Sequence, residues 1–213
     1  PAELGRLSKL ESLAMAQNGL TGPLPPSLAN LHRLEHFVMD SNSFHGPLPA
    51  YINGSSWPRL SQLSLSNCYY TGGIPAGLGS LANLSLLNLS NNKLEGGIPA
   101  ALEQAARLAY LNLSENFLTG PIPLSAAFLE RLGGHLDLRG NPGLCIPTDV
   151  QQQQQQQQQQ IRPCDGRVGL SSTGSLAKKS GAHANSPPRP HCSLHHLVMS
   201  IILLTLHDLL LLL

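Results

Sequence analysis

Leucines recur at a regular interval along the first two-thirds of the chain. Five successive units share the pattern LxxLxLxxNxLxGxIP and are about 24 residues long. They begin at Leu10, Leu34, Leu60, Leu84 and Leu108. A sixth, slipped unit runs through Leu136 and Leu138 and breaks off at Pro142. Since no single unit can bury its leucines alone, the units are expected to stack on one another.

The LxL segment of each unit predicts a short strand whose two leucines enter the same face, because strand side chains alternate with period two. The asparagine that follows can both donate and accept hydrogen bonds, so stacked units predict an asparagine ladder. Its members are Asn18, Asn42, Asn92, Asn116 and Asn141. Cys68 takes this place in the third unit, where its weaker hydrogen bonding should loosen the rung. The Gly-x-Ile-Pro segment is expected to turn the chain on the far side, since proline fixes φ and has no amide donor.

These features predict an α/β-type repeat solenoid with a short parallel sheet on its concave face. We expect the solenoid, with about six repeats and an incomplete N-terminus, over residues 1–145. Residues 146–165 are predicted to form a C-terminal cap loop, with ten glutamines inserted at 151–160. Residues 166–193 are rich in Ser, Gly, Pro and Lys and predict a disordered linker or stalk, because they offer little apolar surface to bury. Residues 194–213 form a hydrophobic tail.

Composition narrows the possible functions. Charged residues make up only 12% of the chain, aromatics only 4%, and the formal net charge is +1, which argues against a nucleic-acid binder and against a core built on aromatic rings. The sequence has no Gly-rich phosphate loop, no Gly-x-Ser-x-Gly elbow and no His-Glu-x-x-His motif. Five of its nine histidines lie after residue 180, including His191-Cys192 and His195-His196, but no second spaced pair accompanies them. We therefore expect no enzyme activity, no cofactor and no metal.

Several stretches carry a family resemblance. The segments NGLTGPLP, NKLEGGIP and NFLTGPIP resemble the plant extracellular leucine-rich repeat, which implies a leucine-rich-repeat superhelix. The segment from Leu136 to Cys145 is similar to the C-terminal cap of plant receptor-like proteins and receptor kinases. The preceding run, Phe128 to Gly133, is similar to kinase-lacking receptor-like proteins related to Too Many Mouths. The resemblance covers residues 4 to about 165.

The resemblance also bears on the cysteines and the chain start. A cysteine pair closes the cap in this family, and Cys145 and Cys164 are the positions that fit a disulfide; two free thiols are the alternative. Cys68 is interpreted as a small buried hydrophobe, and Cys192 has no obvious partner. Residue 1 is proline, with no signal peptide or cysteine-paired N-terminal cap after it, so we interpret the sequence as a fragment or an incomplete gene product.

Four Asn-x-Ser sequons are candidate glycosylation sites. They are Asn53, Asn83, Asn88 and Asn112. Asn88 and Asn112 lie between the strand leucines of successive repeats, on the predicted open face of the sheet. There they would carry glycans that obstruct the face or, if bare, serve as polar contact residues, and the sequence leaves both alternatives open.

The C-terminal tail allows three interpretations. The 20 residues of Leu194–Leu213 are mostly apolar and long enough for a membrane helix, although His207 and Asp208 would be costly in a bilayer. The second interpretation is a glycosylphosphatidylinositol (GPI) signal, with Ser180 as the attachment candidate, a polar spacer and the hydrophobic tail in that order. The third is a mispredicted exon. The first two place the repeats on the extracellular face of the plasma membrane.

Recognition is expected on the concave face, where the polar strand residues of successive repeats form columns. The predicted contact residues for a peptide or a partner receptor-kinase ectodomain are His36, Asp40, Gln62, Ser64, Asn88, Tyr110, Asn112, Asp137 and Arg139. Tyr110 and Arg139 are of the types that dominate interface energies. With strands of typical length, the face measures roughly 490 Å², less than the ~800 Å² per partner of a standard interface.

The sequence thus favours a cell-surface receptor-like protein that binds a peptide or a receptor-kinase ectodomain and signals through that partner. The main alternative is a secreted cell-wall inhibitor of a polygalacturonase-type enzyme with similar repeats, which needs no membrane tail. A weaker alternative is an intracellular repeat scaffold.

Overall fold

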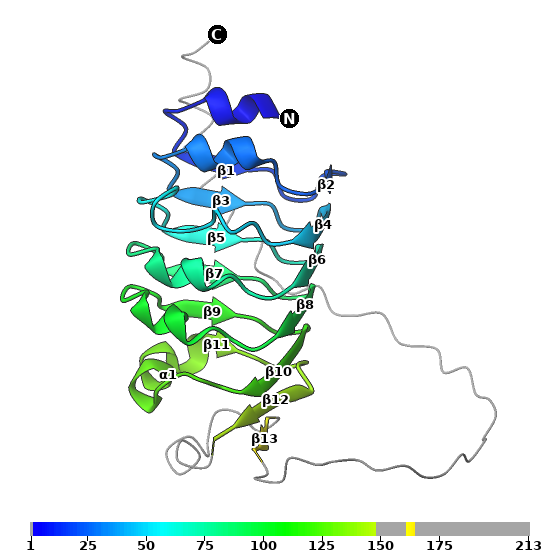
Figure 1. Cartoon of the computed structure of the whole chain (residues 1–213), viewed down its shortest axis with the longest axis vertical. Coiled ribbons are helices and arrows are strands. Elements are labelled where there is room, and N and C mark those ends of the chain that lie inside the picture. Colours follow the sequence, from blue (N-terminus) through cyan, green and yellow to red (C-terminus); the bar gives the residue numbers. More distant parts are fainter. Residues whose placement is uncertain (1, 148–160, 165–213) are drawn as a thin grey trace, which may run out of the picture. The chain divides into compact units, whose positions relative to one another are not determined.

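The computed structural model describes residues 2–147 and 161–164. Figure 1 shows this part of the chain winding in successive turns, each of which contributes one strand to each of two sheets. Strands of one sheet lie beside strands of the same sheet from the turns before and after. The described residues therefore form a solenoid, as the repeat predicts.

The first sheet contains the LxL strands. It has six strands in the order β1-β3-β5-β7-β9-β11, and all neighbours are parallel. Their central residues, such as Leu63, Leu87 and Leu111, face one another in register and are buried. The strands are β1 (Ser12–Ala14), β3 (His36–Val38), β5 (Gln62–Ser64), β7 (Leu86–Asn88), β9 (Tyr110–Asn112) and β11 (Leu136–Asp137).

A second parallel sheet occupies the segments that the sequence predicts only as turns. It has seven strands in the order β2-β4-β6-β8-β10-β12-β13. Each of β2 to β10 contains a glycine with positive φ, for example Gly72 at +72°, a conformation that other residues rarely adopt. The strands are β2 (Thr21–Gly22), β4 (Ser43–Pro47), β6 (Tyr69–Gly72), β8 (Lys93–Gly96), β10 (Phe117–Pro121), β12 (Gly143–Ile146) and β13 (Arg162–Pro163).

Short helices connect the second sheet back to the first. Three of the 3₁₀ helices begin directly after Pro25, Pro75 or Pro99, which stand at their N-caps with φ between −68° and −64°. In the fifth turn an α-helix takes this place, and its N-cap Ser125 accepts a hydrogen bond from the amide of Phe128. The helices are η1 (Ala2–Arg6), η2 (Pro26–Asn30), η3 (Ala76–Ser80), η4 (Ala100–Gln104), α1 (Ala126–Leu132) and η5 (Gly133–His135).

The asparagine ladder is present between the two sheets. Asn92 is typical: its Oδ1 accepts from the Tyr70 amide at 3.1 Å, and its Nδ2 donates to the carbonyls of Leu65 and Leu89 at 2.9 and 3.1 Å. Each such side chain bonds the backbone of its own turn and of the preceding one. The buried members are Asn42, Asn92, Asn116 and Asn141.

Cys68 forms the weaker rung that its chemistry predicts. Its Sγ lies 3.7 Å from the Met39 carbonyl and 3.5 Å from the Ser66 carbonyl, whereas the asparagines make bonds of about 3 Å. The residue is a buried free thiol. Burial raises the pKa of this thiol, so Cys68 packs as a neutral side chain.

The core is less purely aliphatic than the composition suggests. Trp57, Tyr70 and Phe37 are its largest fully buried side chains. The rings of Phe37 and Trp57 lie 5.1 Å apart between centroids, and Tyr51 meets Trp57 edge-on at 5.8 Å. The few aromatics are concentrated in the second and third turns. The expectation that aromatic rings do not build the core is therefore wrong for this part of the solenoid.

The cap disulfide implied by the family resemblance is present. Cys145 and Cys164 are bonded, with their Cα atoms 4.9 Å apart. Beside the disulfide, β13 pairs with β12 in parallel, and the Cys164 amide donates to the Ile146 carbonyl at 2.9 Å. The last turn of the solenoid is therefore covered by a short segment from residues 161–164.

Several predictions fall outside the described residues. These are the glutamine tract 151–160, the linker 166–193, the tail 194–213, Cys192 and the GPI attachment candidate Ser180. Within the described ranges, no helix has the length and apolar character needed to cross a membrane.

Candidate functional site

The six-stranded sheet face arranges the predicted contact residues in columns. Strand pairing places each polar side chain beside its counterpart in the next repeat. One column contains Ser12, His36, Gln62, Leu86 and Tyr110. The next contains Ala14, Val38, Ser64, Asn88, Asn112 and Asp137. The structure therefore brings together residues that lie 24 to 26 positions apart in the sequence.

The predicted contact residues differ in how far they reach the surface. His36, Gln62 and Tyr110 are partly exposed. Ser64 and Asn88 are buried, with 6% and 8% of their surface accessible. The second column is therefore recessed in its middle.

Asp40 joins the second and third turns. Its Oδ1 accepts hydrogen bonds from the Ser64 hydroxyl at 2.7 Å, the Ser66 hydroxyl at 2.8 Å and the Ser66 amide at 2.6 Å. These bonds hold the carboxylate in one orientation along the rim of the sheet.

The side chains of the recessed column bind their own turns. Asn88 accepts from the amide and hydroxyl of Ser90, and Asn112 does the same with Ser114. This local bonding of an asparagine oxygen to backbone two residues ahead stabilises a turn. The sequence predicts Asn88 and Asn112 only as contact residues, because the alternation of strand side chains does not reveal their hydrogen bonds to Ser90 and Ser114.

The C-terminal end of the face carries its most varied chemistry. Arg139 donates to both oxygens of Asp137, from Nε at 2.9 Å and from Nη2 at 2.7 Å. The ring of Tyr110 lies 6.3 Å from that of His135, and the Asn112 amide reaches the Tyr110 hydroxyl at 3.5 Å. We call these five residues the C-terminal cluster.

The ion pair of this cluster sets the charge state of Asp137. Burial favours the protonated carboxyl, but the hydrogen bonds and positive charge of Arg139 outweigh burial, so the pKa of Asp137 lies below its ordinary value. The side chain of Arg139 remains 69% exposed. The cluster thus presents a fixed carboxylate and an accessible guanidinium at neutral pH.

The other two candidate glycosylation sites have bonded amide groups. Asn53 donates to the Ala50 carbonyl and accepts from the amides of Ser55 and Ser56. Asn83 donates to the Pro58 carbonyl and accepts from Arg107 at 2.7 Å. A glycan on either Nδ2 would replace one of these contacts. All four sequons stay predictions.

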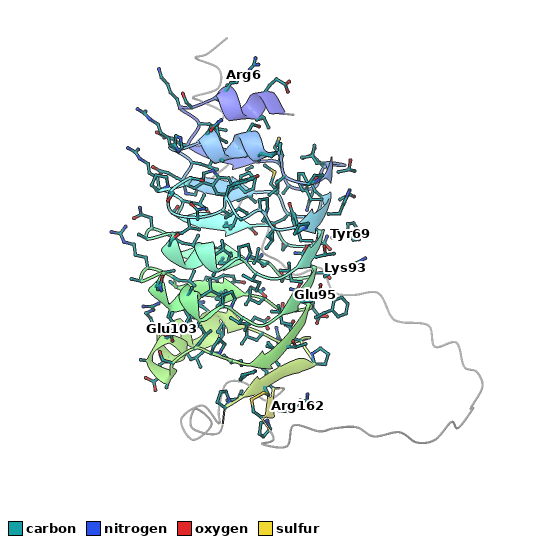
Figure 2. All side chains as sticks on the ribbon, viewed as in Figure 1. Arg6, Tyr69, Lys93, Glu95, Glu103 and Arg162 are labelled. Carbon is teal, nitrogen blue, oxygen red and sulfur yellow. A yellow bond between two sulfur atoms is a disulfide. The ribbon has the colours of Figure 1, made fainter. Side chains whose placement is uncertain are left out.

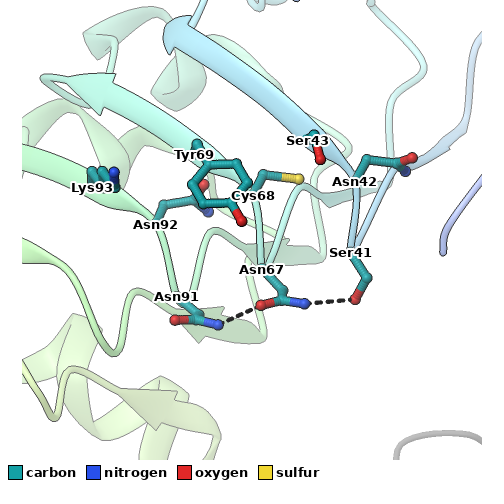
Figure 3. Close-up of a pocket in the computed structure, with 9 residues that line it drawn as sticks. All are labelled: Ser41, Asn42, Ser43, Asn67, Cys68, Tyr69, Asn91, Asn92 and Lys93. Atoms are coloured by element: carbon teal, nitrogen blue, oxygen red, sulfur yellow. Dashed lines mark hydrogen bonds between the residues drawn. The ribbon is translucent and has the colours of Figure 1, made fainter. Parts of the chain in front are cut away.

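A second surface feature lies on the turns that join the two sheets. A polar pocket of about 430 Å³ is lined by three residues from each of three successive turns (Figure 3). They are Ser41–Ser43, Asn67–Tyr69 and Asn91–Lys93. The sequence gives only a weak indication of this pocket, because a single aromatic residue, Tyr69, directly follows a ladder position among these turns.

Two further observations concern metal ligands and buried phenols. The described residues contain no group of three or more His, Cys, Asp or Glu side chains placed to hold a metal ion. Burial raises the pKa values of Tyr51 and Tyr70, which keeps these phenols neutral.

Comparison with known families gives the repeat a name. The family model described as leucine rich repeat matches residues 58–118, and a second model of that description matches residues 9–31. A sequence comparison with curated proteins gave no match.

Solved structures of plant receptors resemble the chain. A chain of the BIR3–SERK2 complex from Arabidopsis thaliana is 37% identical, with a TM-score of 0.59; the match covers 64% of this chain and 70% of that one. The BIR2 ectodomain from Arabidopsis thaliana is 32% identical with a TM-score of 0.57, over 62% of this chain and 68% of that one. The Arabidopsis receptor kinase HAESA, in complex with the peptide hormone IDA and the co-receptor SERK1, is 36% identical with a TM-score of 0.63. That match covers 70% of this chain but only 24% of the HAESA chain.

Proposed function

This chain belongs to the plant leucine-rich-repeat proteins of the receptor type, and from that premise we propose that it is an extracellular recognition module that binds a peptide or the ectodomain of a partner receptor kinase. In this proposal it signals through that partner, as in receptor-like proteins related to Too Many Mouths. The hydrophobic tail at Leu194–Leu213 holds it at the plasma membrane, with the repeats outside the cell.

The observation that carries this proposal is the C-terminal cluster. Tyr110 and Arg139 are of the residue types that supply most binding energy at protein interfaces. Asp137 holds the Arg139 guanidinium in place by two hydrogen bonds, which lowers the entropy lost on binding. His36, Asp40, Gln62 and the recessed Ser64 and Asn88 continue the proposed contact face toward the second turn.

The size of the face supports a shared interface. The six strands are only two or three residues long, so the face measures roughly 290 Å² at about 4.8 Å between strands and 3.3 Å per residue. That is smaller than the sequence-based figure and well below the ~800 Å² of a standard interface. A bound peptide would therefore contact a second receptor as well as this chain. The HAESA complex contains both a peptide hormone and a co-receptor.

Binding of a receptor-kinase ectodomain tests the proposal. The purified full chain is titrated with the SERK2 ectodomain, with and without a peptide fraction from plant apoplast, by biolayer interferometry. Replacing Tyr110 or Arg139 with alanine should weaken binding by on the order of tenfold, as expected for interface hot spots. Arg107→Ala, an exposed arginine on another face, is the matched control and should bind normally. Unchanged binding by both cluster variants would contradict the assignment of the site.

Release from cells tests the location. Phospholipase C should release a GPI-anchored protein from membranes, whereas a membrane helix requires detergent. Recovery of all protein from the soluble wall fraction, together with inhibition of a polygalacturonase, would favour the secreted inhibitor.

A further inference from the structure

Two exposed aromatic rings lie on the second sheet, outside the C-terminal cluster. Tyr69 and Phe117 have 51% and 60% of their surface accessible, whereas Phe37, Trp57 and Tyr70 are fully buried. Both exposed rings directly follow a ladder residue, Tyr69 after Cys68 in the third unit and Phe117 after Asn116 in the fifth. Both rings therefore lie outside the core, with their faces accessible to a ligand.

Lys93 occupies the same repeat position between them. Its Nζ lies 5.4 Å from the centre of the Tyr69 ring, in the range of a cation–π contact. Figure 2 shows Tyr69, Lys93 and Glu95 along one edge of the solenoid. Glu115 occupies the repeat position of Asn91, two residues before Phe117, so the turns beside these rings carry one cation and two carboxylates.

A row of amides and hydroxyls runs beside the rings. Asn91 donates to the Oδ1 of Asn67, and Asn67 donates to the hydroxyl of Ser41 at 3.0 Å (Figure 3). These three residues and Tyr69 line the pocket of about 430 Å³ together with the buried Asn42, Cys68 and Asn92. Amide and hydroxyl groups that remain near the solvent can exchange hydrogen bonds with a polyhydroxylated ligand.

The spacing of the rings is set by the repeat. Neighbouring strands are separated by about 4.8 Å, so rings two repeats apart are separated by about 10 Å. One repeat is therefore close to the length of one pyranose ring in an extended 1,4-linked chain. The repeat thus gives Tyr69 and Phe117 the spacing of alternate sugars in such a chain, with the Lys93 ammonium over the Tyr69 ring.

We propose that this edge, which we call the flank site, binds an extended, neutral, β-1,4-linked oligosaccharide of the kind released from cell-wall polysaccharides. Tyr69 and Phe117 provide the stacking surfaces, and the amides of Asn67 and Asn91 exchange hydrogen bonds with the sugar hydroxyls. The carboxylates of Glu95 and Glu115 disfavour an acidic chain at this edge, so the ligand is a neutral one. The site is separate from the C-terminal cluster, so a protein partner and a wall oligosaccharide could be held at the same time.

Titration with defined oligosaccharides tests the flank site. The full chain is titrated by calorimetry with cellohexaose, with a trimer of galacturonic acid and with a branched high-mannose glycan. Binding should be strongest for cellohexaose. It should rise with chain length up to about three sugars, because the two rings are about 10 Å apart. Preference for the acidic trimer or for the branched glycan would overturn the proposal, as would no binding to any of the three.

Two single variants and one control locate the site. Tyr69→Ala and Phe117→Ala should each weaken cellohexaose binding by on the order of tenfold, a change of about 1.4 kcal/mol. Both residues are exposed, so both variants should fold, which far-ultraviolet circular dichroism verifies. Tyr110→Ala removes an aromatic ring of the C-terminal cluster and should leave sugar binding unchanged. Equal losses in all three variants, or no loss in the first two, would overturn the placement.

Discussion

Arg139 holds Asp137 through both carboxylate oxygens at the C-terminal end of the six-stranded sheet face, with the shorter contact at 2.7 Å. The two residues are separated by one position, so the pair also stiffens the turn that follows β11. A hydrogen bond from the backbone stiffens the turn further, since the Arg139 amide donates to the Asp137 Oδ1 at 3.1 Å.

This pair predicts a small acid-dependent contribution to stability. The pKa of Asp137 is lowered in the folded chain, so the contribution is present above the ordinary value of 3.8 and is lost as the pH falls through the lowered pKa. Because Arg139 is largely exposed, we expect less than about 1 kcal/mol. Urea unfolding of the parent chain and of Asp137→Asn, measured from pH 6 to pH 2, should show a difference that shrinks toward low pH. Glu130→Gln, an exposed position on α1, is the control, and a difference that grows as the pH falls would contradict the assignment.

The weak hydrogen bonding of Cys68 leads us to expect that one substitution there stabilises the folded chain. Cys68→Asn should restore the bonds that the other ladder asparagines make and raise the free energy of unfolding by about 1 kcal/mol. The reverse change, Asn92→Cys, removes bonds of 2.9 to 3.1 Å at a buried position and should lower it by about 2 kcal/mol. The free energy of unfolding of both variants is measured by chemical denaturation without a reducing agent, so that the cap disulfide stays intact. A destabilised Cys68→Asn variant would mean that the third turn has repacked around the smaller thiol.

Replacing Trp57 should cause the largest loss in the free energy of unfolding among the variants considered. It is fully buried, and its Nε1 donates to the Leu28 carbonyl at 2.9 Å. Trp57→Ala should cost about 3 to 5 kcal/mol, because a large cavity is left in the core. Trp57→Phe keeps a ring but leaves the carbonyl without this donor, which should cost about 1 to 3 kcal/mol. Thermal unfolding followed by circular dichroism ranks the variants, and the exposed Tyr69→Phe should be nearly neutral.

The cap disulfide predicts a loss that depends on redox state. Cys145 and Cys164 are 19 positions apart, and opening a loop of this size should destabilise the chain by about 3 kcal/mol in the chain-entropy account. Cys145→Ser, Cys164→Ser and the double variant should therefore unfold alike, at lower denaturant than the parent. A reducing agent should remove the difference between them and the parent. Single variants of unequal stability would point to a separate role for one of the sulfurs.

The sequence predicts the repeat and the first sheet, but it does not predict the second sheet or how deeply individual side chains are buried. The LxL period predicts the strand register that places Leu87 beside Leu111, and the family resemblance implies the Cys145–Cys164 bond. The second sheet was missed because its strands lie in glycine- and proline-rich segments that are typical of turns. The burial of Trp57 was missed because average composition hides a local concentration of rings. The burial of Asn88 was missed because alternation assigns a side chain to a face but does not say how deeply its neighbours cover it.

The pairing of β13 with β12 gives the solenoid tolerance to one kind of genetic change. Residues on both sides of the glutamine tract are fixed to the end of the last turn, at Ile146 and at Arg162–Cys164. A change in the number of glutamines between these two fixed ends would thus leave the register of the stacked leucines and both candidate binding surfaces unchanged.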